Sequence, residues 1–187
     1  MKNDIILAGV GGQGILTIAA IIGKAALKAG LNVKQSEVHG MAQRGGAVLA
    51  HLRLSSAPIH SDLIADGTAD VIIAVEPMEA LRHVGGLAPT GAIVTNSTPV
   101  LNIPYPELEA VLDAIRTYPR HLIIDANGIA AETASARAMN IVMLGAVSRF
   151  IDIDETLLKE VLTETFSRKG DAVVEANLKA FDAGRNA

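Results

Sequence analysis

Four glycines crowd into six positions, residues 9–14, and this cluster separates an apolar run from a long helical stretch. The cluster reads G-V-G-G-Q-G and is called the glycine turn below. A turn of this kind between a buried strand and a helix leaves backbone N–H groups unpaired at the positive end of the helix dipole. The sequence therefore predicts a cradle for a phosphate, a carboxylate or another anion. The alternative is a tight turn whose glycines only permit close packing.

Strand-like and helix-like stretches alternate along the chain, which is typical of an α/β protein. We expect a Rossmann-like three-layer α/β/α fold with a mainly parallel sheet and a helical C-terminal region. Half of the 187 residues are apolar, so residues 1–187 can form a single domain with a sizeable core. The expected strands are 5–10, 31–37, 47–54, 70–75, 92–96 and 122–125, and the expected helices are 13–29, 77–84, 107–117, 128–136, 140–150, 155–168 and 170–183.

Two local patterns refine this outline. Gly30 stands where a helix C-terminal cap is expected and should end the first helix. Residues 47–54 alternate between apolar and polar side chains, which is typical of an antiparallel or half-covered strand. The segment around Pro58 then suggests a hairpin or an excursion from the sheet.

Residues 38–46 form a second glycine-rich segment, called the second loop below, with the sequence V-H-G-M-A-Q-R-G-G. It is too rich in glycine for a helix and too polar for a core strand. Its imidazole (His39) and guanidinium (Arg44) suit proton transfer or hydrogen bonding and the clamping of a carboxylate or phosphate. We expect Arg44→Ala to slow turnover while leaving the chain folded. The alternative is a solvated loop in which Arg44 pairs with Glu37 or Asp62.

Composition narrows the class of protein. The chain has no cysteine, so it can form no disulfide, offers no thiol nucleophile and holds no cysteine-ligated iron–sulfur cluster. A net charge of −4 without a basic cluster argues against a nucleic-acid partner. Residues 5–23 carry no charge, but their glycines break them into a strand and a helix, so we expect a cytoplasmic protein without a membrane anchor. The low charge content favours a covered apolar surface, in a homodimer or in a complex.

The glycine turn also fits the dinucleotide-binding pattern G-x-G-x-x-G through Gly9, Gly11 and Gly14. A nicotinamide cofactor would further need an acidic residue after the second strand, and Glu37 lies there. However, the second loop replaces the helix expected next. An NAD(P)-binding oxidoreductase stays an alternative, as does a purely structural scaffold.

Several polar residues follow the other predicted strands, where α/β proteins bind ligands. Glu76 is one of them, and it can equally cap the following helix. Asn96 and Asp125, together with Ser97, Asn127 and Gly128, are candidates for the same crevice. The five histidines show no spacing typical of metal ligands, and we expect no metal site.

The motifs G-V-G-G-Q-G, S-E-V-H-G-M-A-Q-R-G-G and V-E-P-M-E-A-L-R, in this order, resemble one family. The chain is similar to the gamma subunit or gamma domain of 2-oxoacid:ferredoxin oxidoreductases, and H-G-M-A-Q-R-G-G is most similar to the indolepyruvate oxidoreductase beta subunit. The resemblance implies a complex that oxidatively decarboxylates a 2-oxoacid, such as pyruvate or indolepyruvate, to an acyl-CoA and reduces ferredoxin.

The resemblance further implies that this chain binds no cofactor alone. Thiamine diphosphate, Mg²⁺ and iron–sulfur clusters belong to partner subunits, coenzyme A is a co-substrate, and ferredoxin is reached through the complex. No catalytic residue is assigned firmly, with His39 and Arg44 as candidates. The expected substrate-binding or cofactor-binding residues are Gly11, Gly12, Gln13, Gly14, Glu37, His39, Gly40, Gln43, Arg44, Gly45 and Gly46.

Overall fold

A computed structural model describes residues 1–40, 45–102, 104–133 and 135–187 of the chain. Its centre is a six-stranded sheet with the strand order β2-β3-β1-β4-β5-β6. The strands are β1 (Lys2–Val10), β2 (Asn32–His39), β3 (Ala47–Ser55), β4 (Ala69–Ala74), β5 (Leu87–Asn96) and β6 (His121–Ile124).

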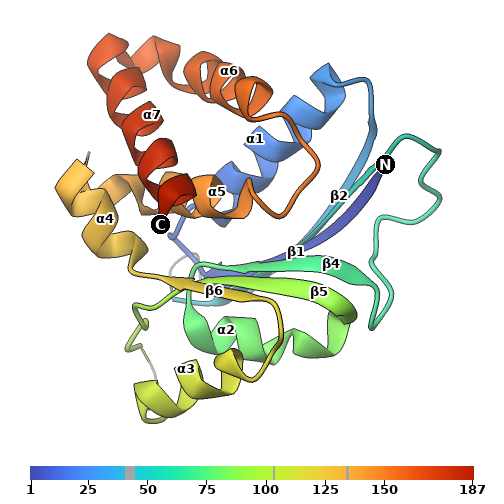
Figure 1. Cartoon of the computed structure of the whole chain (residues 1–187), viewed down its shortest axis with the longest axis vertical. Helices are drawn as coiled ribbons and strands as arrows, with labels where there is room; N and C mark the ends of the chain where they lie inside the picture. Colours follow the sequence, from blue (N-terminus) through green and yellow to red (C-terminus); the bar gives the residue numbers. More distant parts are fainter. Residues whose placement is uncertain (41–44, 103, 134) are drawn as a thin grey trace.

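Helices cover both faces of this sheet, which makes the three layers visible in Figure 1. One face carries α1 (Ile15–Lys28), α4 (Ala126–Thr133), α5 (Met139–Val147), α6 (Glu155–Phe166) and α7 (Asp171–Asn186), and the other carries α2 (Pro77–Arg82) and α3 (Leu108–Arg116). The predicted Rossmann-like α/β/α architecture with a helical C-terminal region is confirmed. No described helix is long and apolar enough to cross a membrane.

The pairing of β3 is the main departure from a fully parallel sheet. β1, β4, β5 and β6 pair in parallel, whereas β3 lies between β1 and β2 and runs antiparallel to both. The alternation over residues 47–54 is therefore correctly interpreted: Val48, Ala50, Leu52 and Leu54 are buried, and the residues between them are partly exposed. The face that β3 shares with α1 is the buried one.

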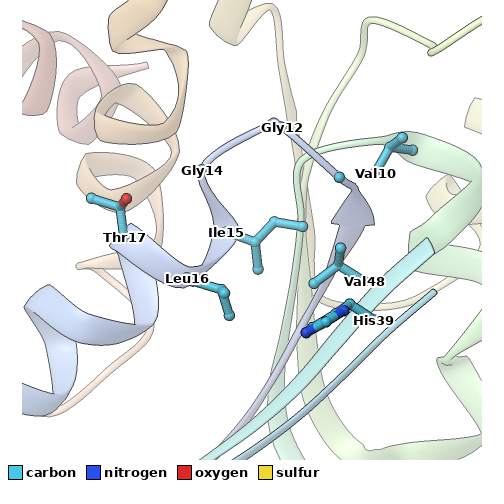
Figure 2. A pocket seen from close by; sticks show the side chains of 9 residues that line it. Val10, Gly12, Gly14, Ile15, Leu16, Thr17, His39 and Val48 are labelled. Atoms are coloured by element: carbon cyan, nitrogen blue, oxygen red, sulfur yellow. The ribbon is translucent and has the colours of Figure 1, made fainter. Parts of the chain in front are cut away.

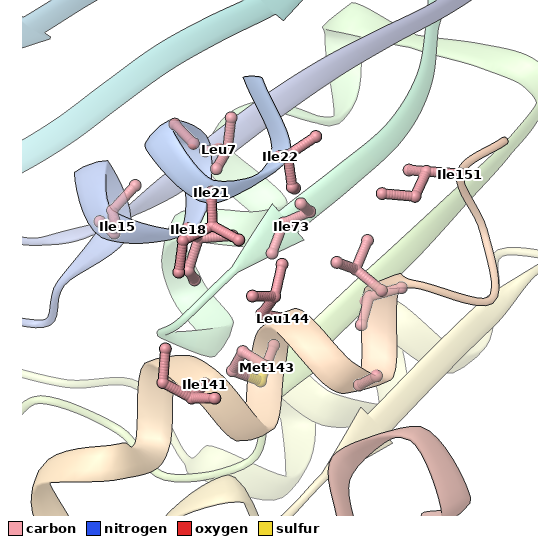
Figure 3. Packing of buried hydrophobic residues seen from close by; sticks show 14 of the residues in the cluster. Leu7, Ile15, Ile18, Ile21, Ile22, Ile73, Ile141, Met143, Leu144 and Ile151 are labelled. Carbon is pink, nitrogen blue, oxygen red and sulfur yellow. The ribbon is translucent and has the colours of Figure 1, made fainter. Parts of the chain in front are cut away.

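The larger core lies between the sheet and the five-helix face (Figure 3). In α1, residues Ile15, Ile18, Ile21 and Ile22 recur at helical spacing and are at most 3% exposed. They meet Leu7 and Ile73 from the sheet and Leu144 from α5. Gly30 follows the end of α1 with φ at 77°, as its predicted capping role requires.

Several boundaries differ from the prediction, and three of the differences have a clear physical reason. Val38 and His39 belong to β2 rather than to a loop, because they pair with Leu49 and Val48 of β3. The strand predicted at 92–96 begins at Leu87. Its first residues were not predicted as a strand, because Pro89 and Gly91 have low strand propensity. Helix α1 begins at Ile15 and not at residue 13, because Gly14 adopts a left-handed conformation as its N-cap.

Candidate functional site

The glycine turn connects the end of β1, at Val10, to the start of α1, at Ile15. Gly12 and Gly14 have φ values of 99° and 78°, a region in which side-chain-bearing residues are strained. At Gly14 a Cβ atom would also lie only 2.5 Å from Nδ2 of Asn140. Both positions therefore require glycine for the backbone path itself.

This path leaves several amides free at the start of α1. The N–H groups of Gly12, Gly14, Ile15 and Leu16 donate to no acceptor among the described residues. Helix α1 has no side-chain cap and no acidic residue in its first turn. Among the described residues, no side chain compensates the positive end of the helix dipole, and such an arrangement favours anions.

The second loop returns onto the glycine turn. The Gly11 N–H donates to the Gly46 carbonyl oxygen at 2.8 Å, and the Gly45 N–H donates to the Gly11 carbonyl oxygen at 3.4 Å. The Gly40 N–H donates to the Ala47 carbonyl oxygen at 3.3 Å, which closes the base of the loop. Two motifs that are separate in the sequence form one structural unit.

A cavity of about 410 Å³, called the glycine cavity below, lies on the α1 face of this unit. Figure 2 shows the apolar side chains of Ile15, Leu16 and Val48 around it, with the His39 ring at its border. His39 is the one ionisable side chain among its described lining residues, and the Thr17 hydroxyl is a further polar group. The lining residues are Val10, Gly11, Gly12, Gly14, Ile15, Leu16, Thr17, His39 and Val48.

The glycine cavity has a polar end and apolar walls. The free amides and the helix dipole favour an anionic group, while Val10, Ile15 and Val48 offer contact to a carbon chain or ring. The four residues with apolar side chains in the lining, and Thr17, were not among the predicted site residues. Thr17 could have been predicted as a site residue from the sequence, because it is the one polar side chain in the otherwise apolar first turn of α1.

The other predicted residues lie in different surroundings. The side-chain amide of Gln13 accepts from the Val10 N–H at 2.7 Å and donates to the Val75 carbonyl oxygen at 3.1 Å, so it joins the ends of β1 and β4. Glu37 is exposed on β2, where its carboxylate accepts from the Gln35 side chain at 3.3 Å. Gln43 and Arg44 lie outside the described residues.

The strand order does not match that of a dinucleotide-binding site. In dinucleotide-binding folds the acidic residue stands at the end of a strand adjacent to β1. Here β3 separates β2 from β1, so Glu37 is two strand spacings away, roughly 9.5 Å, and it does not line the glycine cavity. The pattern G-x-G-x-x-G is present, but its partner residue is displaced.

The weaker candidates after the other strands have structural roles. The Asn96 side chain, 1% exposed, donates to the Val75 carbonyl oxygen and the Asn127 side chain and accepts from the Ala126 N–H. Asp125 accepts from the Gly128 N–H at 2.9 Å at the start of α4. These groups join β4, β5 and α4 and are not among the lining residues of the glycine cavity, so their place in a ligand crevice stays a prediction.

The described residues contain no group of three or more histidine, aspartate or glutamate side chains that could hold a metal ion. The chain also has no cysteine, so it cannot hold an iron–sulfur cluster through cysteine ligands. What the site offers is a set of amides without partners among the described residues, beside an imidazole in an α/β fold.

A family model described as pyruvate ferredoxin/flavodoxin oxidoreductase matches residues 4–187. The chain therefore belongs to this family, and the resemblance seen in the motifs is confirmed. It is 37% identical to the indolepyruvate oxidoreductase subunit IorB of Archaeoglobus fulgidus, an alignment covering 100% of this chain and 95% of the relative. It is 30% identical to the common gamma subunit of the pyruvate/ketoisovalerate oxidoreductases of Thermococcus kodakarensis, over 98% and 95% of the two chains.

Two solved structures resemble this fold. A 2-oxoglutarate:ferredoxin oxidoreductase from Magnetococcus marinus, solved with 2-oxoglutarate, coenzyme A and succinyl-CoA bound, gives a TM-score of 0.78 at 29% identity. That match covers 99% of this chain but 30% of the other. The pyruvate oxidoreductase subunit PORC from Thermotoga maritima gives a TM-score of 0.76 over 99% and 96% of the chains, and its 22% identity supports the fold alone.

Proposed function

We propose that this chain is the gamma-type subunit of a 2-oxoacid:ferredoxin oxidoreductase and that residues 1–187 form one gamma-type domain. The complex would convert a 2-oxoacid and coenzyme A to an acyl-CoA and CO₂, and two electrons would pass one at a time to ferredoxin. Thiamine diphosphate, Mg²⁺ and the iron–sulfur clusters would be held by partner subunits. The missing cysteines support this division of labour.

The chain's own share of the reaction is the glycine cavity. We infer that the free amides at the start of α1 hold a negatively charged group of the 2-oxoacid or of coenzyme A. The observation that carries this inference is that the glycine turn is hydrogen-bonded to Gly45 and Gly46, and that four N–H groups without a partner in the described part of the chain lie at one cavity. Preorganised donors need no rearrangement when the anion arrives.

His39 and Thr17 would complete the polar lining. His39 ends β2 at the border of the cavity, where its imidazole can hydrogen-bond to the ligand or carry a proton. Thr17 lies in the first turn of α1 and is one of the lining residues of the cavity. Both residues would orient the ligand, whereas the bond-breaking steps use cofactor chemistry supplied by the partners.

The substrate class is proposed from the relatives. The identity of 37% to an indolepyruvate oxidoreductase subunit exceeds the 30% to a pyruvate/ketoisovalerate subunit, so indolepyruvate and related aryl pyruvates are the first candidates. The test is 2-oxoacid-dependent dye reduction by the complex, co-purified with its partner subunits, over a panel of aryl, branched and short 2-oxoacids with and without coenzyme A. Strong activity with aryl pyruvates that requires coenzyme A is expected. Activity with no 2-oxoacid would contradict the proposal.

A further inference from the structure

A second cavity lies beside the end of β1 and the start of β3, on the side of the sheet that carries α2. Its volume is about 190 Å³, and it is called the Glu79 cavity below. Val10 lines both this cavity and the glycine cavity. The lining residues are Val10, Gly45, Ala47, Glu76, Met78, Glu79, Arg82, Val100 and Asn102.

One of its two carboxylates is fully engaged. Glu76 is 1% exposed, and its Oε2 atom accepts from the Glu79 N–H at 2.9 Å as the N-cap of α2. Its Oε1 atom accepts from the Tyr105 hydroxyl at 2.6 Å. Burial and the Glu76 carboxylate raise the pKa of Tyr105, so the tyrosine stays protonated and continues to donate. Glu76 therefore has a structural role, which was the alternative considered for it.

The second carboxylate is incompletely satisfied. Glu79 is 4% exposed, and its Oε1 atom lies 3.2 Å from Nε of Arg82. Its Oε2 atom is the one buried side-chain oxygen or nitrogen among the described residues that has no hydrogen-bond partner. Burial raises the pKa of Glu79, and the Glu76 charge adds to this effect against the opposing charge of Arg82. A buried acceptor without a donor is costly, and Glu79 lines the cavity, so a donor that enters there and reaches the carboxylate would relieve this cost.

The charges and hydrogen-bonding groups that line the cavity define which ligand could bind the Glu79 carboxylate. Two carboxylates face one guanidinium, so the cavity has a negative balance, and the Arg82 side chain is 48% exposed at its rim. The Asn102 amide donates to the Gly45 carbonyl oxygen at 2.6 Å and is thus occupied. The ligand must supply hydrogen-bond donors and positive charge. Val10, Met78 and Val100 provide apolar contact for a short carbon stem.

We propose that the Glu79 cavity is a second binding site, which takes an ammonium or guanidinium group on a short alkyl stem. Its volume corresponds to roughly six water molecules at about 30 Å³ each, enough for such a group and too small for a nucleotide. The source is either a lysine or arginine side chain of a partner subunit or a free small amine, since both present the same chemistry to Glu79.

The site is tested with n-propylguanidinium chloride, using n-propylurea as a neutral compound of nearly the same shape. Amide shifts of the ¹⁵N-labelled 187-residue chain are followed during each titration. The expected result is saturable binding of n-propylguanidinium at Glu79 and Gly45, with none for n-propylurea. Equal responses to the two compounds, or saturation by Mg²⁺ in place of n-propylguanidinium, would overturn the proposal.

Two variants separate the carboxylate from the cavity's shape. Glu79→Gln should weaken n-propylguanidinium binding at least about tenfold, because a charge-assisted hydrogen bond is lost. Glu175→Gln, which changes an exposed carboxylate on α7, is the matched control and should bind as the wild type does. Val100→Trp should block the cavity without altering any charge. Wild-type affinity in either Glu79→Gln or Val100→Trp would contradict the site.

Binding measurements on the assembled complex distinguish a side chain of a partner subunit from a free amine as the natural ligand. If a partner side chain fills the Glu79 cavity, n-propylguanidinium should bind the isolated chain and lose at least about tenfold in affinity for the complex, because the occupied carboxylate is no longer free. If the natural ligand is a free amine, both forms should bind the probe equally. Failure of the isolated chain to bind it at all would reject the site while leaving the glycine cavity and its function untouched.

Discussion

The Gly11 N–H and the Gly46 carbonyl oxygen, 35 positions apart in the sequence, are hydrogen-bonded across 2.8 Å. This bond holds the second loop against the glycine turn, so that His39 and the free amides of α1 border one cavity. The proposed function depends on this contact, because the lining of the cavity comes from both segments and neither provides it alone.

The cradle can be tested by removing a single amide hydrogen. Leu16 lies in the first turn of α1, where its N–H has no partner among the described residues and where proline is tolerated. Leu16→Pro should therefore remove an anion donor while keeping the helix. The KM of the assembled complex for coenzyme A or for the 2-oxoacid is expected to rise by about tenfold, the value of one hydrogen bond to a charged group.

Leu16→Ala is the control for this experiment, because it removes the same side chain but keeps the N–H. It should leave the KM within about twofold of the wild type, since the cradle is a property of the backbone. If both variants raise the KM equally, the side chain and not the amide matters.

His39→Ala should slow turnover of the complex, because it removes the one ionisable side chain among the described residues of the glycine cavity. The expected loss in kcat/KM is about tenfold to a hundredfold, typical of an orienting or proton-carrying histidine. His60→Ala, in the exposed segment after β3, is the control and should be silent. A silent His39→Ala, with assembly intact, would favour a scaffold role for this chain.

The ion pair between Asp4 and Arg53 should make the stability depend on pH. Asp4 is 1% exposed, and its oxygens accept from Nε and Nη2 of Arg53 at 2.7 and 3.0 Å. Burial raises the pKa of Asp4, but the hydrogen bonds and charges of Arg53 and Lys2 outweigh it, and the pKa lies below the ordinary 3.8. This stabilisation is therefore present above pH 3.8 and is lost as the pH falls through the lower folded value.

Arg53→Gln would remove two charge-assisted hydrogen bonds from the buried Asp4 carboxylate and leave it only the Lys2 ammonium at 2.8 Å, so it should lower the free energy of unfolding by about 3 kcal/mol near neutral pH. Urea unfolding followed by circular dichroism measures the difference, which should shrink in acid as Asp4 is protonated. Arg116→Gln breaks only exposed ion pairs on α3 and should have no measurable effect. A loss for Arg53→Gln that does not vary with pH would show that the pair is not its cause.

Helices α5 and α7 approach each other through glycine. A Cβ atom on Gly184 would lie 1.9 Å from the Val142 carbonyl oxygen, so Gly184→Ala should force the helices apart and cost about 3 kcal/mol. Gly23→Ala in α1 is the control, because its Cβ would have ordinary contacts at 3.6 and 3.8 Å. That variant should gain about 0.8 kcal/mol from helix propensity. Urea midpoints that move in the same direction for both variants would contradict this reading of the packing.

Local patterns predicted most elements of the fold. The helical stretch between the glycine turn and Gly30 predicted α1, and the alternation in 47–54 predicted an antiparallel or half-covered strand. The position of β3 between β1 and β2 was not predictable, because strand order depends on pairing between distant segments. That pairing also extends β2 to His39 and separates Glu37 from β1.

The site was also only partly predictable, because residue type and spacing are local, whereas the contacts that form a cavity depend on the tertiary structure. The glycine turn and His39 were recognised from residue type and spacing, and the structure places them at one cavity. Gln13 and Asn96 have the same polar chemistry as ligand-binding residues, but their amides bind nearby backbone groups. Glu79 gave no signal, since a glutamate in a short helix is ordinarily exposed, and only the tertiary structure shows its unpaired oxygen.

We propose that this chain contributes a binding cavity to a reaction whose cofactors belong to its partners. The most direct measurement is 2-oxoacid-dependent, coenzyme-A-dependent dye reduction by the purified chain, by the purified partner subunits and by the two recombined. We expect full activity only in the recombined sample, and no tightly bound redox group on this chain. Dye reduction by the chain alone, or undiminished activity of the partners without it, would contradict the account.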